Sequence, residues 1–139
     1  MKIVTRYKED ELFVAENENG NRINIDMRDL DKKESLGPVE MMLAAIAGCA
    51  AVDIVSMIKK KRKTFVDLII ETTAVRRESH PRSLVEINSH YTLISPDTSL
   101  ETFEKVAVMA TEKYCSAADS VKAKINVICA VRNPEDVEA

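Results

Sequence analysis

The stretch VEMMLAAIAGCAAVDIVSMI, residues 39–58, decides how this chain folds. Met, Leu and Ala dominate it, and apolar residues fall on nearly every side of a helix built from it, which is typical of a central helix. Gly37 and Pro38 precede it, and Pro is favoured in the first turn of a helix. The basic run KKKRK, residues 59–63, follows. We therefore expect one long helix from Val39 to about Lys61.

The basic run has a simple structural explanation. Cations at the C-terminus of a helix meet the negative end of the macrodipole. The chain as a whole carries a formal net charge of −3, whereas nucleic-acid-binding domains are usually strongly basic. We therefore expect no nucleic-acid partner.

The stretch at residues 39–58 is also about long enough to cross a bilayer. It contains Glu40 and Asp53, however, and a carboxylate inside a membrane costs several kcal/mol. The N-terminus, MKIVTR, runs into charged residues and lacks the apolar core of a signal peptide. The sequence thus favours a cytoplasmic protein without a membrane partner.

The length and composition fit one ordinary soluble domain. The chain has 139 residues, of which 45% are hydrophobic and 31% charged, with only three Gly and four Pro. Single domains most often hold roughly 100 to 150 residues. We expect one domain over residues 1–139, folded throughout.

Short runs with a preference for β-structure flank the long helix. Before it lie residues 3–7, 12–15 and 22–27, separated by turn-like sequences, which predicts an antiparallel meander followed by a loop over residues 29–37. After it, residues 65–75 and 84–94 predict a hairpin around the turn-prone residues 78–81. In the second of these runs apolar and polar residues alternate, which places His90 on the polar face.

The last third of the chain predicts two helices and a strand. Thr98 and Glu101 have the spacing of a capping box, with Thr98 as the N-cap, and a helical stripe runs over residues 100–114. Residues 116–121 can form a short helix, residues 125–131 alternate as a final strand, and the acidic tail after Asn133 is expected to fray. The elements together predict an α+β fold.

Cys49 and Cys115 are the candidate reactive groups. The thiolate is the nucleophilic form of cysteine, so a working thiol needs a helix N-terminus, a cation or hydrogen-bond donors to stabilise it. Cys115 meets this condition if it is the N-cap of the helix that begins at Ser116. Cys49 looks less activated, because Asp53 lies four residues on, on the same helix face. Glu40 lies about half a turn out of phase with Cys49, so one straight helix does not bring them together.

Core packing is the alternative explanation for each thiol, because free cysteine is often buried as a small hydrophobe. Cys129 alternates with apolar neighbours on the last strand, and we interpret it as structural. A cytosolic protein keeps its thiols reduced, so any disulfide should be transient. His80 and His90 lack partners at metal-ligand spacing, and glycine-rich phosphate loops are missing, so we expect no metal and no cofactor.

Two motifs resemble those of a known family. GPVEMMLAAIAGC, residues 37–49, looks like the first-cysteine motif of the OsmC/Ohr family, the osmotically inducible and organic-hydroperoxide-resistance proteins. EKYCS, residues 112–116, with Ile125-Asn126-Val127, looks like the second. The order of elements also agrees over nearly the whole chain. His80-Pro81-Arg82 further resembles the short YhfA-like subgroup of OsmC-related proteins.

The resemblance implies an OsmC-like fold in which antiparallel sheets wrap around long, central, buried helices of an intertwined homodimer. It implies that Cys49 attacks organic hydroperoxides and that Cys115 resolves the sulfenic acid to a disulfide, which dithiols such as lipoyl proteins reopen. Such substrates would suit a pocket lined by Met41, Met42 or Phe residues. The family's helper carboxylate would be Glu40.

The chain also departs from the family pattern. The Glu that directly follows Pro in well-studied members is Val39 here, with Glu40 one position later, and the Pro after the second cysteine is Ser116. The family's early arginine has two candidates, Arg22 and Arg6. Two other functions therefore remain open: a non-catalytic dimeric protein that binds a hydrophobic small molecule, and a redox sensor or thiol-transfer protein.

Overall fold

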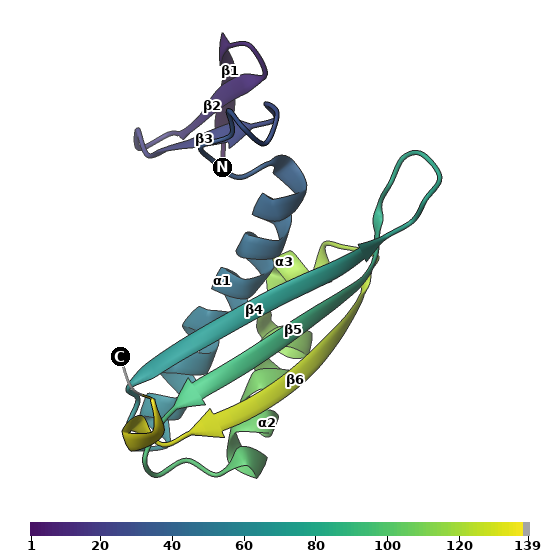
Figure 1. The fold of residues 1–139 in the computed structure, drawn as a ribbon. Helices are drawn as coiled ribbons and strands as arrows, with labels where there is room; N and C mark the ends of the chain where they lie inside the picture. The colour runs from purple at the N-terminus through teal and green to yellow at the C-terminus, as the bar shows by residue number, and fades with distance from the viewer. Residues whose placement is uncertain (138–139) are drawn as a thin grey trace. The chain divides into compact units, whose positions relative to one another are not determined.

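The computed structural model describes residues 1–137 and shows an α+β fold with two three-stranded sheets (Figure 1). The chain forms two compact units, one over residues 1–42 and one from residue 43 onward. Each unit is described separately below. The prediction of one domain over residues 1–139 stays a prediction.

The N-terminal unit contains the expected antiparallel meander. Strands β1 (Ile3–Glu9), β2 (Leu12–Asn17) and β3 (Arg22–Asp26) pair in chain order. The turn between β2 and β3 depends on Asn17, whose side-chain oxygen accepts hydrogen bonds from the backbone N–H groups of Asn19 and Asn21. Gly20 in this turn has φ +84°, a conformation that glycine adopts without steric cost. The strand predictions are confirmed within two residues at each end.

Asp26 organises the loop that follows β3. Its side chain is fully buried and accepts two hydrogen bonds from the Arg28 guanidinium, at 2.9 and 2.8 Å. It also accepts backbone N–H bonds from Arg28, Glu34 and Ser35. These donors hold the pKa of the Asp26 carboxyl well below its usual range. The loop predicted at residues 29–37 is therefore present and tied to the sheet by one carboxylate.

The long helix α1 (Pro38–Lys60) confirms the element predicted from the opening stretch. Within the second unit its buried residues, Ile46, Ala50, Ile54 and Ile58, recur every four positions and form one stripe. Val52, in contrast, is 71% exposed. The rest of the chain therefore covers only one side of α1. Burial of its other sides by a second copy of the chain in a homodimer stays a prediction.

The second sheet has the strand order β4-β5-β6. Strands β4 (Asp67–Arg76) and β5 (Leu84–Ile94) form the predicted antiparallel hairpin, and His90 is exposed as predicted. Strand β6 (Lys124–Arg132), however, runs parallel to β5. The expectation of purely antiparallel sheets is therefore wrong for this pair. Parallel neighbours need a crossover connection, which the helices between β5 and β6 provide.

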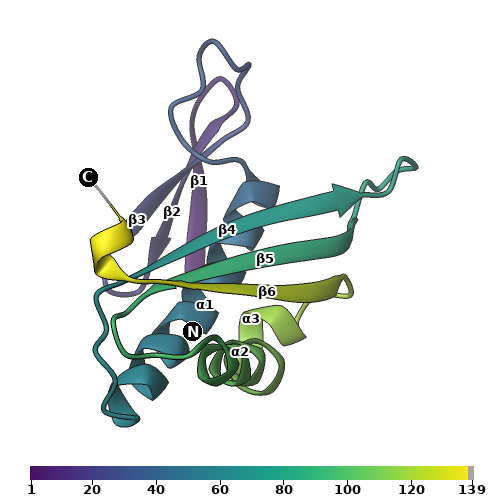
Figure 2. The same cartoon turned by 60° about the horizontal axis from the view of Figure 1, so that its bottom comes forward.

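The crossover consists of α2 (Leu100–Met109), the π-helical segment η1 (Ala110–Tyr114) and α3 (Ser116–Asp119). Figure 2 shows α2 and α3 under the same face of the β4-β5-β6 sheet. The core between them is centred on Tyr91, Phe103 and Val106, against the buried stripe of α1. The helix predicted over residues 100–114 is thus real, but its last turn widens from α to π.

Two terminal details differ from the predictions. The N-cap of α2 is Ser99, whose hydroxyl accepts the Thr102 N–H at 3.1 Å. Thr98 instead hydrogen-bonds Ser95 within a buried turn. In the tail that was expected to fray, residues 134–136 form a 3-10 turn, η2 (Pro134–Asp136), because the Asn133 side chain caps it. Residues 138–139 lie outside the described residues.

Candidate functional site: two neighbouring thiols

Cys49 and Cys115 lie close to each other in the second unit. The Cys115 thiol donates to the backbone carbonyl of Ile46, one turn before Cys49, over 3.7 Å. The Cys49 sulfur lies 4.0 Å from the hydroxyl of Ser116, the residue after Cys115. The fold thus brings together two cysteines that are far apart in the sequence, and both are free thiols.

The break between η1 and α3 positions Cys115. Its backbone is extended (φ −78°, ψ 102°), and its sulfur accepts the N–H of Ala118 at 3.3 Å as the N-cap of α3. The predicted capping position is confirmed. The π-helical turn just before it ends the preceding helix, and such turns are frequent at functional sites.

The two thiols differ in acidity. The pKa of Cys49 is lowered, chiefly by a hydrogen bond from the Ala117 backbone N–H and next by one from the Cys115 thiol, with Ser116 adding its hydroxyl and N–H. The pKa of Cys115 is raised, chiefly by burial and next by the hydrogen bond to Cys49. Cys49 is therefore the thiol that ionises first, with Cys115 as its proton-bearing neighbour.

This order corrects the prediction that Cys115 is the better-activated thiol. The first turn of α3 directs its N–H groups at Cys49 as well as at Cys115, and Cys115 is only 3% exposed. Asp53, expected to oppose ionisation of Cys49, is not among the groups that shift its pKa most. The sequence predicted that Cys115 caps α3. It did not indicate that the N–H groups of Ser116 and Ala117 face the sulfur of Cys49.

Apolar side chains surround the pair. Cys115 belongs to a buried cluster with Ile46, Ile87 and Ala118, and Cys49 packs against this cluster. Such surroundings exclude water from Cys115, whereas Ser116 is exposed and leaves the site a polar edge.

Two further hydroxyls were missed by sequence reasoning. The buried hydroxyl of Tyr91 on β5 lies 2.9 Å from that of Thr111 on η1. Burial is the main cause that raises the pKa of Tyr91, and a negative charge on Cys115 adds to it. Tyr91 has the alternation of a core strand residue, and nothing in that pattern indicates a polar partner.

Glu40 lies in the N-terminal unit. Its carboxylate accepts hydrogen bonds from Lys33 Nζ at 2.8 Å and from the backbone N–H of Gly37 at 3.0 Å. Both contacts lower the pKa of Glu40. The bond to Gly37 satisfies a free N–H at the start of α1, as in one half of a capping box.

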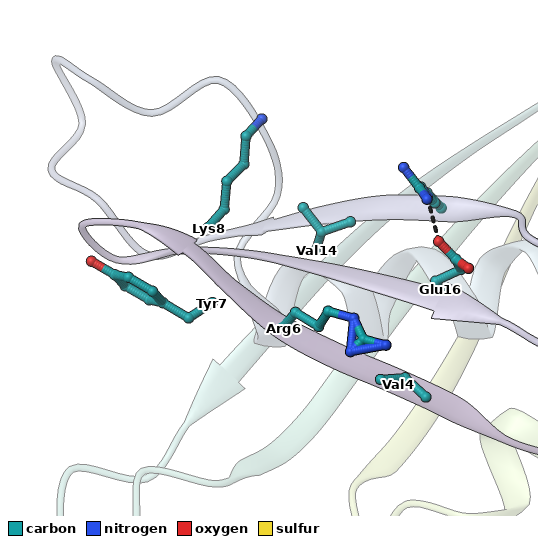
Figure 3. A pocket seen from close by; sticks show the side chains of 7 residues that line it. Val4, Arg6, Tyr7, Lys8, Val14 and Glu16 are labelled. Atoms are coloured by element: carbon teal, nitrogen blue, oxygen red, sulfur yellow. Dashed lines mark hydrogen bonds and ion pairs between the residues drawn. The ribbon is translucent and has the colours of Figure 1, made fainter.

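Arg6 and Arg22 also belong to the N-terminal unit. Arg22 pairs with Glu16. Arg6 lines a concavity of about 250 Å³ on the meander. Figure 3 shows the side chains that line it. The other lining residues are Val4, Tyr7, Lys8, Val14, Glu16 and Arg22.

Cys129 differs from the other two cysteines. It packs against the main core, and burial raises the pKa of its thiol to about 11.

Across residues 1–137 the structure has no group of three His, Cys, Asp or Glu side chains that could hold a metal ion. Phe103, a candidate lining residue for a substrate pocket, is fully buried in the core.

Comparison with known proteins places this site in a family. Residues 31–130 match the OsmC-like protein family. The chain is 33% identical to Protein YhfA of Escherichia coli K12 over 127 residues, which is 91% of this chain and 93% of YhfA. The chain belongs to the OsmC-like protein family, and the recognition made from the two cysteine motifs is confirmed.

Solved structures agree on the fold. The crystal structure of an OsmC-like protein from Mycoplasma pneumoniae superposes with a TM-score of 0.78 at 21% identity, covering 95% of each chain. The organic hydroperoxide resistance protein OhrB of Bacillus subtilis superposes with a TM-score of 0.61 at 14% identity, covering 94% of this chain and 96% of OhrB. The predicted α+β, OsmC-like fold is therefore confirmed.

By length and composition α1 is a helix that could cross a membrane, with a mean hydropathy of 2.1. Core helices of soluble proteins, which are mostly buried, pass the same test, and 22% of the residues in the apolar window of α1 are buried here.

Proposed function

We propose that this protein reduces organic hydroperoxides with Cys49 as the attacking thiol and Cys115 as the resolving thiol, in oxidative stress defence. The observation that carries the proposal is the closeness of the two cysteines: the Cys49 sulfur lies 4.0 Å from the hydroxyl of Ser116, and the thiol of Cys115 donates to the Ile46 carbonyl on the preceding turn of α1. A lowered pKa supplies thiolate at Cys49, and a raised pKa keeps a proton on Cys115. The solved relatives include proteins named for organic hydroperoxide resistance.

The proposed reaction has three steps. The Cys49 thiolate attacks the outer peroxide oxygen, the O–O bond breaks, and the leaving alkoxide takes a proton to become an alcohol. The resulting Cys49 sulfenic acid condenses with the Cys115 thiol, which forms the disulfide and releases water. An external dithiol, such as a lipoyl protein, then reduces the disulfide by exchange and is itself oxidised.

Glu40 enters the proposal as a helper carboxylate that stays ionised because Lys33 and Gly37 stabilise its charge. Its described contacts lie within residues 1–42. A homodimer, the assembly of this family, would supply a second copy of every such group. We also propose a cytoplasmic location, where a reduced thiol pool sustains the cycle.

Peroxide consumption by cysteine variants tests the proposal. Cys49→Ser should lower the rate of cumene hydroperoxide consumption about a hundredfold or more, because the nucleophile is lost. Cys115→Ser should leave a Cys49 that reacts once and then overoxidises. Cys129→Ser is the matched control and should retain wild-type activity. Equal activity of wild type and Cys49→Ser would refute the proposal, and a bound apolar ligand without turnover would favour a binding protein.

A further inference from the structure

A groove lies between the C-terminal half of α1 and α2. It encloses about 390 Å³, within the roughly 300–1,000 Å³ typical of small-molecule sites. Figure 2 shows the two helices under the same sheet, away from the hairpin end. Six residues line the groove: Met57, Lys60, Lys61, Lys105, Val106 and Met109.

The floor of the groove is apolar and adaptable. Val106 is buried, Met57 is half-buried, and Met109 is 43% exposed although it is a large apolar side chain. Methionine is flexible and polarizable, and it recurs at surfaces that accept varied apolar ligands. The neighbouring hollow along α2 shares Lys105 and Met109 with the groove. It adds Val108 and three charged residues, Glu104, Glu112 and Lys113.

The rim of the groove is cationic. Lys60 and Lys61 are exposed, and within residues 1–137 no carboxylate lies within ion-pairing distance of either. Lys105 contacts Glu101 Oε1 at 3.1 Å on the surface, so Lys60 and Lys61 supply most of the unbalanced charge. The helix macrodipole accounts for cations in the last turn of α1, but not for an apolar groove beside them.

We propose that this groove binds a single-chain aliphatic carboxylate, with the chain over Met57, Val106 and Met109 and the carboxylate at Lys60 and Lys61. Burial of the apolar chain away from water drives binding. The two ammonium groups select an anion over a cation or a neutral head group. This site is separate from the thiol pair, so it does not depend on the proposed peroxidase activity.

Methyl NMR on protein labelled at the methionine methyl groups tests the proposal, with dodecanoate below its micellar concentration as the probe. The Met57 and Met109 signals should shift saturably, and Met27, in the N-terminal unit, should not move. Dodecyltrimethylammonium should bind far more weakly. The double variant Lys60→Gln/Lys61→Gln should weaken dodecanoate on the order of fivefold. Lys122→Gln, which removes a lysine outside the groove, should leave the affinity unchanged.

Four results would overturn the proposal. The first is equal affinity for dodecanoate and the ammonium analogue, which would remove the role of the lysines. The second is a shift of all methionine signals together, which indicates non-specific detergent-like binding. The third is a Met109 signal that depends on protein concentration and ignores dodecanoate, which would show that a second copy of the chain covers the groove. Binding only of anionic vesicles would assign the groove to a lipid surface instead.

Discussion

The Cys115 thiol donates to the carbonyl of Ile46, one turn before Cys49, and the pKa values of the two thiols shift in opposite directions. The N–H groups at the start of α3 explain the lowered pKa of Cys49, and burial explains the raised pKa of Cys115. The two sulfurs come from separate elements, α1 and the start of α3, so the difference depends on how these elements pack.

Cys49 should be the most reactive of the three thiols toward iodoacetamide. Because its pKa is lowered, its alkylation rate should rise with pH through a midpoint lower than that of an ordinary cysteine thiol. Cys129, with a pKa of about 11, should stay unmodified near neutral pH. Peptide mass spectrometry after timed alkylation at a series of pH values measures all three. A midpoint for Cys49 above that of free cysteine would contradict the site described here.

Ser116→Ala should raise the pKa of Cys49 and slow its alkylation at neutral pH, because the variant removes the hydroxyl 4.0 Å from the sulfur. Ser120→Ala is the matched control, since the Ser120 hydroxyl donates to the Ser116 carbonyl and does not contact the thiol. The pH dependence of alkylation gives the readout. The same profile in both variants would mean that the backbone N–H groups alone stabilise the thiolate.

Tyr91→Phe should destabilise the second unit by about 1–3 kcal/mol, because it leaves the buried Thr111 hydroxyl without its partner at 2.9 Å. Urea unfolding monitored by circular dichroism measures the change. Replacing both groups, in Tyr91→Phe/Thr111→Val, should recover part of the loss. Additive losses in the double variant would contradict a direct hydrogen bond.

The Asp26 carboxylate should make the stability of the N-terminal unit depend on pH. Its folded-state pKa is depressed below the value of about 3.9 for an unfolded chain, so its stabilisation is fully present above that value. The stabilisation is lost as the pH falls from there through the folded pKa. Asp26→Asn should lose the order of the 29–37 loop already at neutral pH, by amide hydrogen exchange. Asp29→Asn, at an exposed neighbour, should not.

Glu40→Gln separates the two roles open to this carboxylate. The glutamine can still accept the Gly37 N–H but loses the ion pair with Lys33. A helper role predicts about a tenfold lower rate of peroxide consumption with little change in thermal stability. An unchanged rate with a lowered melting temperature would restrict Glu40 to capping α1.

Patterns that are local in sequence predicted the fold well. The apolar run of α1, the alternation in β5 and the change of helix at Cys115 each depend on a few neighbouring residues. The direction of β6 was missed, because alternation is the same in parallel and antiparallel strands. Asp26 was also missed, since a single carboxylate at the end of a strand has no periodic signal.

The candidate site was predicted in part. The two cysteines could be selected from their motifs, but the order of their acidity could not. That order depends on the direction of the Ala117 N–H and on the burial of Cys115, both of which are set by packing between distant segments.

The most direct test of the central claim is mass spectrometry of the reduced protein after one equivalent of cumene hydroperoxide. We predict that a Cys49–Cys115 disulfide forms rapidly while Cys129 stays reduced. The disulfide should form faster with cumene hydroperoxide than with hydrogen peroxide. Thiols that remain unreacted, or a disulfide that involves Cys129, would contradict the account.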